Sequence, residues 1–89
     1  MKSRTTRGFR EAFDRLPPEV QVQARTVFRA WLKDPCRPSL RFKRVAGTQE
    51  PAFSVRIGLH WRALGVKRND DLIWFWIGSH AEYDKFING

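Results

Sequence analysis

The spacing of apolar residues changes near residue 40, and this change restricts the chain to a fold with helices first and a sheet after them. Apolar residues at helical spacing predict a short helix over about 8–16. A second apolar stripe predicts a helix that opens at Pro18-Glu19, where a proline and an acid suit the first turn, and ends at Asp34-Pro35. Pro17 and Pro18 separate the two helices, as is typical of a helical hairpin.

From Leu40 onward apolar and polar residues alternate, which is the period of a β-strand. The alternation predicts a first strand from Leu40 to Lys43, with a bulge or a strand end near Arg44. Further strands are expected over 53–57, 61–67 and 72–77. The last of these is apolar at every position, as in a central strand covered on both faces, and Gly78 should end it.

The two ends of the chain carry weaker signals. Residues 1–8 are polar and fit either a weak edge strand or a loose segment, whereas residues 80–87 have apolar side chains at helical offsets. The predicted fold class is therefore α+β. An N-terminal helical hairpin packs on one face of a small antiparallel sheet of about four strands, followed by a short C-terminal helix or turn. We expect a single domain over residues 1–89, because a chain of this length builds one core.

Cysteine usage and hydropathy indicate the surroundings in which such a domain works. Cys36 is the single cysteine, so no internal disulfide is possible. The first residues lack a signal-peptide pattern, and no apolar run approaches the ~18 residues that a membrane span needs. We expect a cytoplasmic protein without membrane contact. Two histidines and one cysteine without ligand spacing predict no metal site, and no cofactor is expected.

Positive charge is concentrated in the middle of the chain. The net charge is +8, and residues 37–68 hold eight basic side chains and one acid, Glu50, a net of +7. Residues 69–89 hold one basic and four acidic side chains, a net of −3. Arginines outnumber lysines twelve to five, and the planar guanidinium suits two-point contacts with phosphate. These features predict a polyanionic partner, and they favour a nucleic acid over a membrane surface.

Several short strings occur in an order that we recognise. They are Phe53-Ser-Val-Arg-Ile-Gly, His60-Trp-Arg-Ala-Leu and Trp76-Ile-Gly-Ser-His-Ala-Glu-Tyr-Asp, preceded by Leu16-Pro17 before a helix and by Asp34-Pro35 before residues 38–43. Together they resemble the RelE/ParE superfamily of type II toxin–antitoxin toxins over nearly the whole chain from about Phe9. The ending is more similar to RelE and HigB-like members than to ParE members that act on gyrase.

The resemblance implies a function and a set of partners. Members of the RelE/HigB branch are ribosome-dependent endoribonucleases, or mRNA interferases, which bind in the ribosomal A site and inhibit translation by cutting mRNA there. They form a tight complex with a cognate antitoxin, and that complex binds operator DNA to repress its own operon. The resemblance therefore implies a metal-independent hydrolase whose partners are an antitoxin, the ribosome with its mRNA, and operator DNA.

RNA cleavage of this type needs a base for the 2′-hydroxyl, stabilised charge on the phosphate and an acid for the leaving 5′-oxygen. The alternation over 53–57 places Arg56 on the face opposite the helix-packed core, where the resemblance implies an RNA-binding surface. The resemblance also implies that Arg62 clamps the phosphate. It implies that His80 and Tyr83 supply the proton-handling or stacking groups, and histidine titrates nearest neutral pH.

Three further residues are candidates for positioning the RNA. Arg41 and Lys43 are basic side chains on the first predicted strand, and phosphate contacts of this kind supply affinity without sequence choice. Trp61 offers a ring for stacking on a base, although at least one of the four tryptophans must fill the core. We interpret Glu82 and Asp84 as part of a solvated acidic turn.

Two other functions stay open for this sequence. The shared fold also suits a ParE-like protein that poisons DNA gyrase without cleaving RNA, and it suits a non-catalytic nucleic-acid-binding relative. Ser54 stands where some members of the superfamily have a second lysine, which disfavours proton transfer through several lysines. A mechanism based on the histidine, the tyrosine and the two arginines is then favoured.

Overall fold

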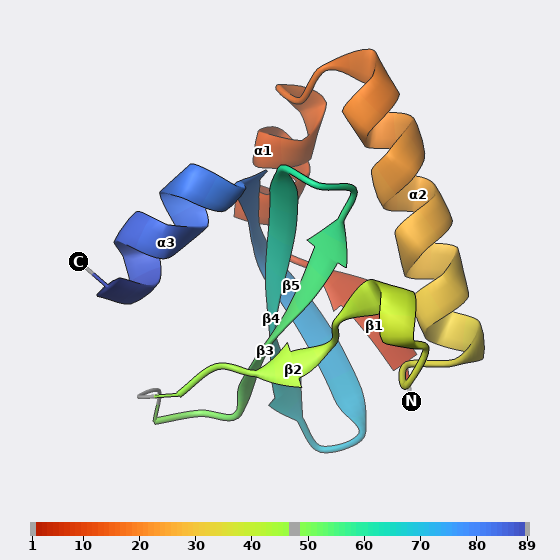
Figure 1. Cartoon of the computed structure of the whole chain (residues 1–89). Coiled ribbons are helices and arrows are strands. Elements are labelled where there is room, and N and C mark those ends of the chain that lie inside the picture. The colour runs from red at the N-terminus through yellow and green to blue at the C-terminus, as the bar shows by residue number, and fades with distance from the viewer. Residues whose placement is uncertain (1, 47–48, 89) are drawn as a thin grey trace.

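The chain folds into a mixed sheet with helices on both of its faces (Figure 1). The computed structural model describes residues 2–46 and 49–88. In chain order the elements are β1 (Lys2–Thr5), α1 (Arg7–Asp14), α2 (Pro18–Lys33), the 3-10 helix η1 (Pro38–Leu40), β2 (Lys43–Arg44), β3 (Ala52–Ile57), β4 (Trp61–Arg68), β5 (Asp71–Ser79) and α3 (His80–Asn88).

The five strands lie in the order β1-β5-β4-β3-β2. All neighbours are antiparallel except β1, which runs parallel to β5. The predicted α+β class is confirmed, with the helical hairpin on one face and α3 on the other, but the sheet has five strands rather than about four and is mixed rather than wholly antiparallel. Of the two alternatives left open for residues 1–8, an edge strand forms over Lys2–Thr5, and Met1 lies outside the described residues.

The pattern of apolar residues could not predict β1 firmly, because every one of its side chains is exposed. The strand is held by backbone pairing along β5 and by polar contacts, two of which are made with β5 side chains. The Trp74 indole Nε1 donates to Ser3 Oγ at 2.9 Å, and the Arg4 guanidinium lies 3.3 Å from the Asp71 carboxylate. Because these interactions join distant parts of the chain, nothing local in the sequence signals them.

The helical hairpin forms as predicted and is fixed by side-chain caps. Thr6 precedes α1, and its Oγ1 accepts a hydrogen bond from the Phe9 backbone N–H. At the other end, the Gln21 amide of α2 donates to the carbonyls of Phe13, Asp14 and Leu16. These carbonyls lie at the end of α1 and in the turn after it, so a single side chain ties the second helix to the first.

The strand predicted over Leu40–Lys43 is wrong in most of its length. Leu40 ends η1, and Arg41 adopts a left-handed backbone with φ of 45°, so only Lys43 and Arg44 pair with β3. Leu40 is nevertheless buried, and Phe42 stacks on the Phe53 ring at 5.0 Å. The alternation was produced by a tight turn that directs two apolar side chains into the core, and not by a pleated strand.

Two apolar clusters lie on opposite faces of the sheet. The larger one fills the space under α1 and α2, where the Trp74 ring meets Phe28 at 5.0 Å and Trp31 at 5.5 Å. The smaller one lies under α3 and contains Leu64 and Tyr83. We call these two sides of the sheet the hairpin face and the α3 face.

A bulge in β5 decides which residues reach each face. Leu64 pairs with Trp76 and Gly65 pairs with Trp74, so Phe75 is an extra residue opposite β4. The extra residue shifts the alternation, and Trp74 packs on the hairpin face while Trp76 packs on the α3 face. The apolar run at 72–77 therefore covers both faces, as predicted, although the strand continues past Gly78 to Ser79.

Gly78 allows the Trp76 indole to lie against the strand backbone, and replacing it with alanine should destabilise the fold. A Cβ at this position would lie 2.6 Å from Trp76 Cζ2. We expect Gly78→Ala to lower the free energy of unfolding by about 1–3 kcal/mol in urea denaturation. Gly8→Ala is the matched control, because its Cβ would meet only Thr6 Oγ1 at 4.0 Å and should gain up to about 1 kcal/mol. Equal stabilities of the two variants would contradict this packing.

Candidate nucleic-acid interface

Four of the predicted functional residues meet on the α3 face. Arg56 of β3 and Arg62 of β4 are directly paired across the two strands. The Tyr83 ring of α3 covers the Arg62 guanidinium, with Cζ 5.1 Å from the ring centroid. The His80 ring lies 6.1 Å from that of Tyr83. These side chains come from three elements and form one contiguous cluster.

The Arg62 guanidinium is buried and incompletely hydrogen-bonded. The residue is 7% exposed. Its Nη1 donates to Ser54 Oγ at 3.4 Å, a long bond, and its Nε is buried without a hydrogen-bond partner among the described residues. A buried cation with unused donors is costly unless an anion completes it. The arrangement is therefore suited to an oxyanion such as a phosphate.

Arg56 is held at the edge of the same cluster. Its Nε donates to the Gly58 carbonyl at 2.8 Å, which aligns the guanidinium along the turn after β3. Its two terminal nitrogens make no hydrogen bond within the described part of the chain. Placed directly across from Arg62, this side chain adds a second positive charge to the site.

α3 begins with a reciprocal capping arrangement. Glu82 Oε1 accepts from the Ser79 N–H and hydroxyl at 3.2 and 3.0 Å, and the Glu82 N–H donates to Ser79 Oγ. The first helical residue, His80, donates its N–H to the His60 carbonyl at 2.6 Å. These contacts fix where α3 leaves the sheet. The sequence signal was present in the serine and glutamate three residues apart, and the acidic-turn interpretation missed it.

The His80 imidazole has a partner that sequence reasoning also missed. Its Nδ1 lies 3.1 Å from Asp84 Oδ2, one helical turn further on. Both side chains are about half exposed, so the pair contributes little to stability. Its effect is on orientation, because a carboxylate at Nδ1 favours the tautomer that leaves Nε2 without a proton. The histidine and the aspartate four residues apart on a helix were the available signal.

The remaining candidates are distributed around the cluster. Lys43 pairs with Ser54 across β2 and β3, so it belongs to the same face, one row from the two arginines. Arg41 lies at the rim, where it lines a cleft of about 580 Å³ together with Arg56. Trp61 is placed differently, because it is half-buried and packs against the hairpin-face core. The structure thus brings five predicted residues together on one face and leaves Trp61 on the other side.

The acid in the basic middle of the chain lies away from this cluster. Glu50 accepts two hydrogen bonds from the Arg68 guanidinium, at 3.0 and 3.1 Å, at the far end of β4. Hydrogen bonding to Arg68, together with its positive charge, lowers the pKa of the Glu50 carboxyl below its usual value. The pairing holds this carboxylate beside Arg68, at the end of β4 opposite Arg62.

No group of three or more His, Cys, Asp or Glu side chains within residues 2–46 and 49–88 is placed to hold a metal ion. Over the same residues, no helix is both long and apolar enough to cross a bilayer.

Comparison with known families decides where the chain belongs. Residues 18–85, most of the chain, match the family of the ParE-like toxin domain. The chain belongs to this toxin family. The predicted membership of the RelE/ParE superfamily is therefore confirmed. No curated protein sequence matches this toxin significantly.

The same fold recurs in solved toxin structures. A copper-bound mutant toxin from Helicobacter pylori has a TM-score of 0.65 at 22% identity, over 92% of this chain and 97% of that one. The RelB–RelE antitoxin–toxin complex from Methanococcus jannaschii has a TM-score of 0.74 at 11% identity, over 93% and 96%. YafQ from E. coli has a TM-score of 0.74 at 7% identity, over 92% and 96%. At these identities the likeness shows the fold.

Because the Arg62 guanidinium is buried and incompletely hydrogen-bonded, this side chain should lower the free energy of unfolding. We expect Arg62→Met to unfold with a free energy equal to that of the wild type or higher by about 1–2 kcal/mol, because the methionine removes a buried charge and fills similar space. The check is urea denaturation followed by tryptophan fluorescence. Lys43→Met serves as control, since this exposed position should change stability by no more than about 0.5 kcal/mol. A loss of more than about 1 kcal/mol in Arg62→Met would instead identify the guanidinium as structural.

Proposed function

We propose that this toxin is a metal-independent endoribonuclease that cuts mRNA on the ribosome and thereby inhibits translation. The observation that carries the proposal is the buried guanidinium of Arg62, whose Nε has no partner among the described residues. It lies beside a second arginine and beneath a tyrosine whose ring also neighbours a histidine. This set supplies the charge-stabilising and proton-transferring groups that RNA cleavage requires.

The reaction is an internal displacement at phosphorus. The 2′-oxygen attacks the adjacent phosphate and loses its proton to a base, the P–O5′ bond breaks, and an acid protonates the 5′-oxygen. A 2′,3′-cyclic phosphate and a 5′-hydroxyl result. Arg62 and Arg56 stabilise the additional negative charge on the phosphate oxygens as the new bond forms. His80, with Nε2 available, and the Tyr83 hydroxyl are the two groups assigned to proton transfer.

The same surface accounts for the proposed partners. Ribosome-bound mRNA would lie on the α3 face, with Lys43 and Arg41 contacting its phosphates. A cognate antitoxin with acidic segments would cover this face and neutralise it, and the resulting complex would bind operator DNA. These partners place the toxin in the cytoplasm.

Cleavage should depend on Arg62 and Tyr83 more than on the total charge of the sheet. In translating extracts analysed by primer extension, we expect Arg62→Ala to reduce codon-register cuts by about 100- to 1000-fold. Tyr83→Phe should reduce them by about 100-fold or more, because it removes a proton-handling hydroxyl and keeps the ring.

Arg68→Gln is the control for net charge in this experiment. It removes one positive charge from the other end of β4 and should leave the cuts unchanged. Growth arrest by the Arg62→Ala, Tyr83→Phe double variant at the wild-type level, without cuts in the mRNA, would refute the ribonuclease assignment.

A second function is favoured by the family match itself, which is to the ParE-like domain. Under that alternative this toxin inhibits DNA gyrase and cleaves no RNA. Inhibition of gyrase supercoiling by the purified protein, combined with intact mRNA, would establish it. If the purified protein does not inhibit gyrase, mRNA stays intact and growth is normal on induction, this toxin is a non-catalytic relative.

Affinity for RNA should fall steeply with salt. For a single strand the logarithm of the binding constant falls by about 0.7 per phosphate neutralised for each tenfold rise in salt. We expect Lys43→Gln to flatten this slope by about 0.7 in anisotropy titrations with a 2′-O-methyl RNA that cannot be cut. Arg68→Gln should leave the slope unchanged, and a salt-independent affinity of the wild type would contradict a phosphate-binding face.

A further inference from the structure

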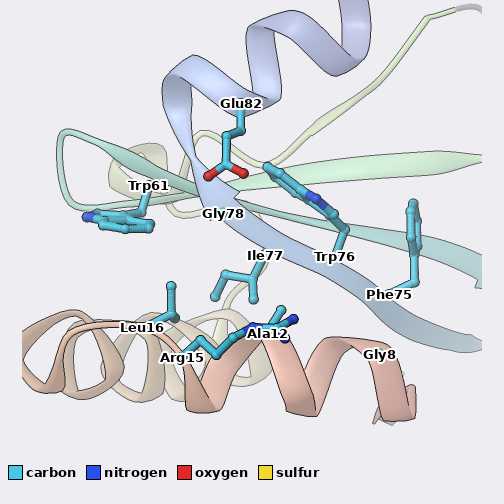
Figure 2. A pocket seen from close by; sticks show the side chains of 10 residues that line it. All are labelled: Gly8, Ala12, Arg15, Leu16, Trp61, Phe75, Trp76, Ile77, Gly78 and Glu82. Atoms are coloured by element: carbon cyan, nitrogen blue, oxygen red, sulfur yellow. The ribbon is translucent and has the colours of Figure 1, made fainter.

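A cleft of about 480 Å³ lies along the edge of β5, between the start of α3 and the helix α1 (Figure 2). Figure 2 shows the Glu82 carboxylate entering from α3, Arg15 on the α1 side, and the rings of Trp61 and Trp76 on either side of Gly78. The volume is in the range of small-molecule sites. The cleft adjoins the arginine cluster, because Gly78 is the strand partner of Arg62 and Glu82 precedes Tyr83.

The backbone of β5 is open along this cleft. Pairing with β1 ends where Thr5 meets Trp74, after which the chain turns away into α1. The Ser79 N–H is directed away from β4, since it donates to Glu82. Ile77, two residues earlier on the same strand, therefore directs its own N–H and carbonyl toward the cleft. One hydrogen-bond donor and one acceptor are thus presented side by side.

This open edge is too short for an added peptide strand. The bulge at Phe75 interrupts the ladder on one side of Ile77, and the bond from Ser79 to Glu82 occupies the next outward-facing N–H on the other. A single residue remains to make ladder contacts. One residue suits a small planar ligand that has a donor and an acceptor along one edge, as a nucleobase does.

The aromatic rings of the cleft are held in place. The Trp76 indole lies against Gly78, where a Cβ would approach it to 2.6 Å, and it also contacts the rings of Tyr83 and Phe86. Trp61 is partly buried against the hairpin-face core. Both indoles keep exposed surface on the cleft, and an unstacked base binds such a surface through its π-face.

The Glu82 carboxylate gives the cleft a chemical preference. Its Oε1 caps α3, while Oε2 makes no hydrogen bond to the residues that the structure describes. An ionised carboxylate only accepts hydrogen bonds, so it selects a base edge that carries an amino group and repels one lined by carbonyl oxygens. It also disfavours an acidic peptide as occupant.

We propose that this cleft is a base-binding subsite that takes one unstacked RNA base with an exocyclic amine, namely adenine, cytosine or guanine, and discriminates against uracil. The proposal rests on the proposed function, because it makes RNA the ligand. In it, a base stacked on the exposed surface of the Trp76 indole donates its amino group to Glu82, and its neighbouring phosphate lies toward Arg62. Arg15, on the opposite wall of the cleft, contacts the RNA backbone.

The test compares uncleavable 2′-O-methyl hexamers of adenosine and of uridine by fluorescence anisotropy, with the full chain and without ribosomes. We expect the adenosine hexamer to bind about tenfold more tightly. Glu82→Gln should bring the two affinities close together, because glutamine still caps the helix but offers uracil a donor. Asp70→Asn makes the same charge change in the β4–β5 turn and should preserve the tenfold difference.

Trp76→Leu should weaken both hexamers by about tenfold, through loss of the stacking surface. Equal wild-type affinities for the two hexamers, or a preference that survives Glu82→Gln, would overturn the proposal. The Ile77 amide gives an independent readout in NMR spectra. If an acidic extended peptide shifts it and RNA does not, the cleft belongs to a protein partner. The binding result is separate from cleavage, since loss of cuts in Arg62→Ala with intact base preference tests only the catalytic assignment.

Discussion

The extra residue in β5 sets the relation between the two faces of the sheet. Without it, Trp74 and Trp76 would point to the same side, because residues two apart on a strand share a face. With Phe75 inserted opposite β4, one indole completes the core under the helical hairpin and the other supports α3. The position of α3 brings Tyr83 over Arg62, so the basic cluster and the neighbouring cleft both depend on this local shift in register.

The chemistry of the α3 face follows from the few hydrogen bonds that the Arg62 guanidinium makes. A guanidinium has five donors, and here a long bond to Ser54 and the Tyr83 ring are its principal partners. Function and stability are therefore opposed at this residue, which is common where a site must remain able to bind charge. Ser54 contributes to both effects, since its small hydroxyl leaves room beside the Arg62 guanidinium that a longer side chain would occupy. Glu50, the acid within residues 37–68, is hydrogen-bonded to Arg68 at the opposite end of β4, so it does not reduce the charge at the cluster.

Helices and long strands could be predicted from the sequence because their signals are local. The apolar stripes of α1 and α2, the prolines between them and the alternation in β3 all depend on neighbours within a few residues. β1 could not be predicted with the same certainty, because its exposed side chains gain nothing from burial and its partners are far along the chain. Leu40 and Phe42 gave a false strand signal, since a tight turn can bury two alternate residues as well as a pleat can. In the site, strand periodicity placed Arg56 on the face opposite the helical hairpin, and Arg62 was proposed from the family resemblance alone. The link from Asp84 to His80 needed a helix that the sequence left as a helix or turn.

The pairing of β1 with β5 also orders events during synthesis. Lys2 lies beside Asp71 and Thr5 beside Trp74, so β1 has no strand partner until the intervening residues 6–70 have been synthesised. α3, which carries Tyr83 and His80, is the last element in the chain. The helical hairpin can form early from local contacts, but closure of the sheet awaits contacts between distant residues. Arg56, Arg62 and Tyr83 come from three elements in the second half of the sequence, so the basic cluster can be assembled only after the helical hairpin has been synthesised.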